Sequence, residues 1–245
     1  RLSLCFGKNE KGGFSVELFL QELAKLGDRF YLAFVAADRW KLYLSGLGNT
    51  LAITLGAICI STVLGMLLCL MKISRYRILR GPAKAYIDVI RGIPVVVQLM
   101  FIYFVVLVTW TNKTAVGIIA FGLNSAAYTA EIFRSGILAV DKGQMEAGRS
   151  LGLNYMTTMF EIIIPQAIRS ILPALGNEFI MLLKDSSLIT VIGGKELLYA
   201  AQGIMNRTYE AMFPLLGVAL VYLVLVMLFT RLLAKFERRL AQSDR

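Results

Sequence analysis

The residues best suited to chemistry in this sequence are charged side chains that lie inside long apolar stretches. The stretch 167–192 contains Glu178, Lys184 and Asp185, followed directly by the hydroxyl of Ser186. On a helix, Glu178 and Asp185 share one face two turns apart, and Lys184 lies about 100° round the axis from Asp185. Charges at membrane depth are costly and usually face a bundle interior or a cavity. These groups therefore either form ion pairs between helices or line the route of a polar solute.

A second charged pair, Glu131 and Arg134, lies in the apolar stretch 116–138. The two residues are one helical turn apart, so they can simply neutralise each other. Alternatively, Glu131 lines the route of the solute.

Gln98 follows Pro94 by one helical turn in the stretch 85–109. A proline at this point bends a helix and frees backbone carbonyls, which is tolerable only toward a cavity or a neighbouring segment. The uncharged head of Gln98 makes it another candidate for the polar route. Arg91 is expected at the cytoplasmic edge, held by Asp88 or by a lipid phosphate.

Several chemistries are excluded by the residues present. The sequence has no histidine, so His-based acid–base catalysis and His-ligated metals are ruled out, and its three cysteines form no C-x-x-C pair. The run "GGKEL" lacks the first glycine and the Ser/Thr of a phosphate loop, whose places hold Ile189 and Glu196. We predict no catalytic residue, no metal site, no cofactor and no ATP binding in this chain.

The composition predicts the elements that position these residues. Hydrophobic residues make up 57% of the 245 and charged residues only 17%, against about 45–50% and about 25% in soluble domains. Several charge-free stretches reach the ~20 residues that cross a bilayer core. We predict an all-α integral membrane protein with five transmembrane helices, at about 46–71, 85–109, 116–138, 167–192 and 211–234.

The loops predict the orientation. Basic residues crowd 72–84 and follow the fifth span, and positively charged loops stay in the cytoplasm. We therefore expect a multi-pass plasma (inner) membrane protein whose N-terminus is outside, with residues 237–245 as a cytoplasmic tail. Residues 1–45 are expected to form an external or interfacial amphipathic segment, because apolar residues recur with helical spacing at Val16, Phe19, Leu20 and Leu23.

The cytoplasmic segment after the third span carries helix signals. Asp141 can cap a short helix over about 142–152, and Gly152 can end it in a left-handed conformation. A second helical piece starts near Asn154 and is expected to be interrupted by Pro165. From these signals alone the segment is either an ordinary interfacial helix or a docking site for another body.

The run "EAGRSLGLNYMTTMFEIIIPQAIRSILP" resembles the EAA motif of the permeases of ABC importers. Four more stretches, in chain order, resemble the polar amino acid subfamily of these permeases: "GLGNTLAIT", "DVIRGIPVVVQLMFIYF", "AYTAEIFRSGI" and "NEFIMLLKDSSLITVIG". Gly148 departs from the motif, which usually has a second alanine there. Glycine keeps the helix thin, although it lowers helix propensity by up to about 1 kcal/mol.

The resemblance implies a permease domain over 46–236 and a coupling helix that docks in a separate cytoplasmic ATPase subunit. A second permease chain, identical or paralogous, would complete the pathway, and ATP and Mg²⁺ would bind in the ATPase. An external binding protein would deliver a polar amino acid. The implied contact core for the ATPase is Glu146, Ala147, Gly148, Leu151 and Gly152.

An amino acid needs an acceptor for its ammonium group and a donor for its carboxylate, and Asp185 and Lys184 supply one of each. The candidate substrate path is Gln98, Glu131, Glu178, Lys184, Asp185 and Ser186. The alternative function is a secondary amino acid transporter that is ion-coupled through its intramembrane carboxylates. Such folds often show paired half-repeats, which this sequence does not display.

Overall fold

The computed structural model describes residues 16–242, and residues 1–15 and 243–245 lie outside the described part. The first third of the predicted N-terminal segment and the end of the predicted tail therefore fall outside it. Within residues 16–242 every regular element is helical, as the sequence predicts.

The apolar stretches form the long helices of the bundle. Four segments are long and apolar enough to cross a membrane: 36–73, 113–138, 155–192 and 212–240. They are built on α2 (Trp40–Ile73), α5 (Lys113–Leu138), α8 (Ile164–Asp185) and α10 (Met212–Gln242). A fifth crossing is made if α3 (Arg77–Gly92) and α4 (Val95–Phe101), with the π turn Ile102–Val106, count as one bent span.

Two helix starts differ from the sequence prediction. α2 begins at Trp40 rather than near Gly46, and its additional first turns include the buried Tyr43. Before α8, the short helix α7 (Tyr155–Thr158) continues through a π turn, Met159–Ile163. Pro165 therefore falls in the first turn of α8, where a missing N–H is tolerated, and does not interrupt the helix.

The end of the last helix also differs from the sequence prediction. α10 runs without a break through the predicted start of the cytoplasmic tail and reaches Gln242. The last span and the described part of the tail are thus one continuous helix.

The predicted bend at Pro94 is present, with an angle of 108° between α3 and α4. The side-chain amide of Gln98 donates to the carbonyls of Ile90 and Ile93, at 2.7 and 2.8 Å. Both carbonyls lie just before the proline, where the helical hydrogen bonds are interrupted. The buried Gln98 thus satisfies the polar groups that the bend would otherwise leave bare in the membrane.

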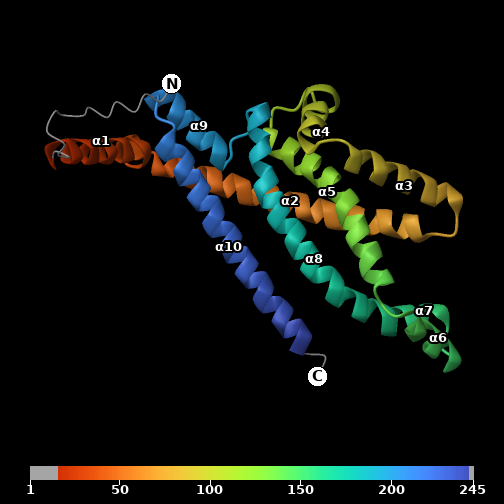
Figure 1. The fold of residues 1–245 in the computed structure, drawn as a ribbon. Coiled ribbons are helices and arrows are strands. Elements are labelled where there is room, and N and C mark those ends of the chain that lie inside the picture. The colour runs from red at the N-terminus through yellow and green to blue at the C-terminus, as the bar shows by residue number, and fades with distance from the viewer. Residues whose placement is uncertain (1–15, 243–245) are drawn as a thin grey trace, which may run out of the picture.

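The centre of the bundle is the packing of α2 against α5, which cross in Figure 1 with α3 and α8 on either side. The facing surfaces are rich in small residues, which let backbones approach closely where lipid provides no hydrophobic drive between helices. Gly65 is an example, because a β-carbon there would lie 2.6 Å from the methyl group of Thr129. The hydroxyls of Ser61 and Thr129 meet across the same contact at 3.5 Å.

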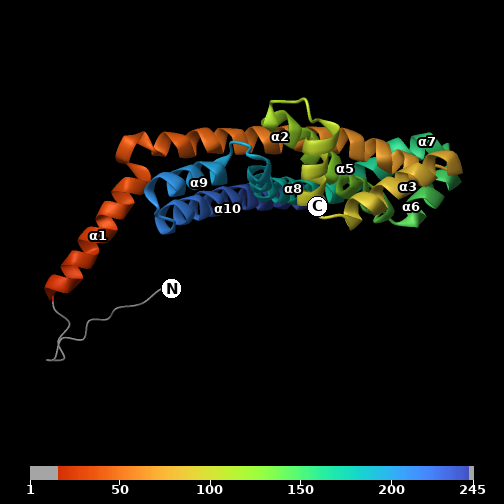
Figure 2. The ribbon, with the colours of Figure 1, turned by 90° about the horizontal axis from the view of Figure 1, so that it is seen from above.

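Helix α1 (Val16–Phe34) extends away from the bundle (Figure 2). It turns into α2 through a short 3₁₀ element, Ala36–Asp38, in which Ala37 and Asp38 have positive φ. An ion pair of 3.6 Å between Arg29 and Glu210 ties α1 to the segment before α10. The placement of this segment at a membrane surface stays a prediction.

A second short helix, α9 (Leu197–Thr208), lies beside the N-terminal part of α2 (Figure 1). It follows the 3₁₀ element η4 (Ser186–Ile192) and the left-handed residue Gly193. Gly46 makes the contact possible, since a β-carbon there would lie 2.8 Å from the carbonyl oxygen of Glu196 and from Cα of Leu197. Both neighbours are backbone atoms, so a side chain could not be accommodated by a rotamer change.

We predict that Gly46→Ala lowers stability by about 1–3 kcal/mol, because backbone must move to admit the methyl group. Gly48→Ala is the matched control in the same helix, since a β-carbon there meets nothing within 4 Å. It should stabilise by up to about 1 kcal/mol through helix propensity. Thermal unfolding of both variants in detergent tests this prediction. Equal shifts of the unfolding midpoint in the two variants would contradict the close contact between Gly46 and the backbone of Glu196 and Leu197.

Candidate functional site

A cavity of about 370 Å³ lies at the bend between α3 and α4, closed by α5 and α8. Its charged lining residues are Arg91 from the end of α3, and Glu178 and Asp185 from α8. The remaining lining residues are Gly92, Ile93, Pro94, Val95, Asn124, Tyr128, Met181 and Leu182. The cavity thus brings one cation and two carboxylates to the same space from helices far apart in the sequence.

Arg91, which the sequence analysis expects at the cytoplasmic edge beside Asp88 or a lipid phosphate, is exposed and lines this cavity. Its guanidinium carbon lies 5.3 Å from the centroid of the Tyr128 ring, in a cation–π contact. The bend after Gly92 brings the end of α3 against α5, which is why a residue at the end of a predicted span reaches the cavity.

The two carboxylates stand as the sequence predicts, on one face of α8. An oxygen of Glu178 accepts a hydrogen bond from the hydroxyl of Ser125 at 2.6 Å, and this bond holds the carboxylate beside α5. No ion pair is recorded for Glu178 or Asp185 within residues 16–242. Both carboxylates therefore line the cavity, and the structure gives neither of them an ion-pair partner within these residues.

Gln98, Lys184 and Ser186 lie outside the cavity lining. Gln98 supports it from behind, because its oxygen accepts a hydrogen bond of 3.2 Å from the side-chain amide of Asn124. Lys184 is exposed, consistent with its position about 100° round the helix from Asp185. Ser186 is buried, and its hydroxyl donates to the carbonyl of Leu183 at 2.8 Å.

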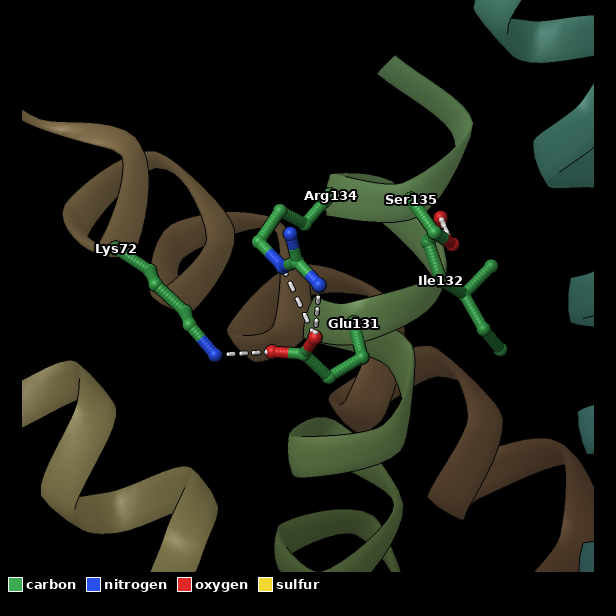
Figure 3. A network of polar contacts seen from close by, with 5 residues as sticks. All are labelled: Lys72, Glu131, Ile132, Arg134 and Ser135. Atoms are coloured by element: carbon green, nitrogen blue, oxygen red, sulfur yellow. Dashed lines mark hydrogen bonds and ion pairs between the residues drawn. The ribbon is translucent and has the colours of Figure 1, made fainter. Parts of the chain in front are cut away.

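Glu131 lies in an ion cluster instead of the cavity wall (Figure 3). One carboxylate oxygen contacts the ammonium group of Lys72 on α2, and the other lies 2.8 Å from the guanidinium of Arg134. The cluster is partly buried and ties the C-terminal part of α2 to α5. These contacts favour the structural interpretation of the Glu131–Arg134 pair over a place on the solute route.

The segment predicted to dock an ATPase contains α6 (Lys142–Ser150), with Asp141 as its cap and Gly152 at φ +86° after its end. Glu146, Ala147, Leu151 and Gly152 are exposed, and the exposed fraction of Leu151 is 82%.

The resemblance to the motif implies that Gly148 contacts the ATPase, but the structure places Gly148 inside this chain. It is buried, and a β-carbon there would lie 2.6 Å from the methyl group of Thr158. Its small size lets α6 pack on α7 of the same chain, which the motif alone does not reveal.

Glu196 is a buried polar centre to which the sequence analysis assigned no structural role. Its side chain is only 1% exposed. One oxygen accepts from the backbone N–H of Tyr199 at 2.9 Å, and the other from the hydroxyls of Tyr222 at 2.8 Å and Thr50 at 3.4 Å. It therefore joins α9 to both α10 and α2. Glutamate is not among the preferred N-cap residues, so no local signal marks it.

The stability of the protein should depend on pH through Glu196. Burial raises the pKa of Glu196 above its usual value of 4.5, and the hydrogen bonds donated to the carboxylate only partly oppose this. The protonated side chain of Glu196 therefore adds to the free energy of unfolding at a pH below the pKa that Glu196 has in the unfolded chain. This stabilisation is lost as the pH rises through the higher pKa that Glu196 has in the folded protein. The thermal midpoint of the unmodified protein should fall relative to that of Glu196→Gln as pH rises from acid toward neutral. A difference that stays constant with pH would contradict the assignment.

Comparison with known sequences defines the class of protein. The family described as "Binding-protein-dependent transport system inner membrane component" matches residues 57–242. The chain therefore belongs to this family of inner-membrane ABC permeases, and the ion-coupled secondary transporter is disfavoured.

The similar proteins are permeases of amino acid systems. The chain is 40% identical to the arginine transport system permease protein ArtQ of Bacillus subtilis, over 82% of this chain and 93% of ArtQ. It is 39% identical to the putative glutamine transport system permease protein GlnP of Rickettsia typhi, over 78% of this chain and 89% of GlnP.

Solved structures agree with the fold. A crystal structure of an amino acid ABC transporter with histidines matches with a TM-score of 0.78 and 44% identity, over 81% of this chain and 94% of that chain. The MetNI methionine ABC transporter matches with a TM-score of 0.72 over 84% of this chain and 99% of that one. Its identity of 20% means that this second likeness concerns the fold alone.

Proposed function

We propose that this chain forms the membrane path of an ABC importer for polar amino acids, with the cavity between α3, α4, α5 and α8 as its substrate site. The observation that carries the proposal is the meeting of Arg91 with Glu178 and Asp185 in one cavity. Membership of the permease family supports the transport role, and the names of its relatives support amino acids as the substrate class.

The charges in the cavity match a cationic amino acid best. The guanidinium of Arg91 can bind the α-carboxylate by paired hydrogen bonds. One of the carboxylates, Glu178 or Asp185, can then accept hydrogen bonds from the α-ammonium group. The other remains for a second positive charge on the substrate side chain.

We predict that Glu178→Gln and Asp185→Asn each raise the KM for lysine or arginine uptake by about tenfold or more, because a hydrogen bond to a charged group contributes about 1.5–3 kcal/mol. Neutral amino acids should be affected less. Lys184→Gln is the matched control, since Lys184 lies on α8 outside the cavity lining. Uptake assays in proteoliposomes test this, and unchanged uptake of cationic and neutral substrates in both cavity variants would exclude the site.

We further propose that α6 is the coupling helix and that the end of the molecule bearing α6 is cytoplasmic. Figures 1 and 2 show α6 and α7 at the end of the bundle away from α1 and α9. The exposed side chains of Leu151, Tyr155 and Met156 offer apolar contacts to a partner. On this proposal the partners are an ATPase subunit that binds ATP and Mg²⁺, a second permease chain, and an external binding protein. The N-terminus is then outside and the C-terminus cytoplasmic.

We predict that Leu151→Arg and Glu146→Lys each reduce co-purification of the ATPase subunit and abolish most transport-coupled ATP hydrolysis. Both side chains are exposed, so the chain itself should still fold and insert. Lys142→Gln, at the other end of α6, is the control and should behave like the unmodified chain. Normal ATPase capture and normal uptake by both variants would overturn the coupling role of α6.

A further inference from the structure

A second cavity, of about 400 Å³, opens between α2 and α9 at the end of the molecule away from α6. Its polar lining residues are Ser45 and Asn49 from α2, with Lys195, Tyr199 and Arg207 from the loop and helix of α9. Leu42, Gly46, Glu196, Ala200 and Gly203 complete the lining. This cavity shares no residue with the proposed substrate site.

The charge that this cavity presents is positive. Lys195 and Arg207 are both exposed, and no ion pair is recorded for either within residues 16–242. The one carboxylate in the lining, Glu196, is buried and accepts hydrogen bonds from three donors. The nearby Glu210 is paired with Arg29. An acidic partner surface would therefore meet two cations without a competing anion.

An exposed aromatic side chain, that of Tyr209, follows Arg207 by two residues at the end of α9. Tyr209 ends α9, is 96% exposed, and is held in the left-handed region at φ 55°. Non-glycine residues in this region are strained, and such positions cluster at functional sites. Tyrosine and arginine are also the residue types that most often dominate binding energy at protein interfaces. Arg207, Tyr209 and the half-exposed ring of Tyr199 thus make a surface of interface character.

The same surface is held rigidly. Glu196 joins the start of α9 to Thr50 of α2 and Tyr222 of α10. The backbone N–H of Leu197 in turn donates to the hydroxyl of Thr50 at 3.3 Å. A surface that is ordered before binding loses less conformational entropy when a partner docks.

We propose that the cavity between α2 and α9, together with Tyr209 directly after the end of α9, is the docking surface for an acidic face of the extracytoplasmic binding protein. This inference rests on the proposed function, which puts α9 outside. The chain also links docking to the substrate site, because Asp185 of the substrate cavity immediately precedes η4, which leads into α9. The seven residues of η4 and the four residues 193–196 separate this cavity from α9.

The test uses the assembled permease–ATPase complex in nanodiscs. Purified amino-acid-binding proteins, loaded with substrate, are screened for stimulation of ATP hydrolysis by the unmodified complex, and the stimulating protein is the probe. We expect the double variant Lys195→Glu/Arg207→Glu to weaken its affinity at least tenfold and to reduce the salt dependence of binding. Tyr209→Ala should weaken the affinity as well. Basal ATP hydrolysis without the binding protein should not change.

The matched control is Arg238→Glu/Arg239→Glu, an exposed basic pair near the other end of α10, which should leave the affinity for the probe unchanged. A photoreactive p-benzoylphenylalanine in place of Tyr209 should cross-link to the binding protein. Cross-linking to a second permease chain instead, or unchanged affinity in both the double variant and Tyr209→Ala, would overturn the docking surface. If no binding protein stimulates the unmodified complex, the proposed function and this inference fall together.

Discussion

The close approach of α2 and α5 is the contact on which the rest of the molecule depends. In a lipid environment helices gain little from hydrophobic burial against each other, so small residues and interhelical hydrogen bonds must hold them. Gly65 and Ser61 of α2 meet Thr129 of α5 in the middle of this contact. The Glu131 cluster ties the same two helices near their ends. Helix α3 then packs on both through Ala83 and Ile87, so the bend and the cavity are positioned relative to this pair.

The bend at Pro94 leaves backbone carbonyls that need hydrogen-bond donors, and the residues that satisfy them also support the cavity. Each carbonyl freed inside a membrane must find a donor, and Gln98 supplies donors for two of them. The remaining polar atom of its side chain, the amide oxygen, accepts from Asn124, which lines the cavity. One glutamine thereby permits the bend and orients part of the wall. Gln98 is consequently a support for the proposed site, although its sequence context suggested a place on the route itself.

The proposed sites lie along a single continuous path through the chain. The cavity carboxylates are on α8, whose N-terminal end joins α7 and α6 through a π turn and whose C-terminal end leads through η4 to α9. Long helices transmit displacements as nearly rigid bodies, and such movements are the usual basis of switching between states. A partner at α6 and a partner at α9 would therefore both act on the same helix. Glu196 fixes one end of this path to α2 and α10.

The sequence by itself determined the helical class, the apolar segments, the bend at Pro94 and the short capped helix α6, because each depends on local composition, periodicity or a single backbone constraint. The shared face of Glu178 and Asp185 also follows from helix geometry alone. Tertiary structure decided which polar groups meet. Arg91 reaches the cavity only because the chain bends after it, Gly148 faces Thr158 only because α6 folds back on α7, and Glu196 finds its partners on α2 and α10. Such contacts join residues distant in the chain, and a one-dimensional pattern carries no information on which helix faces come together.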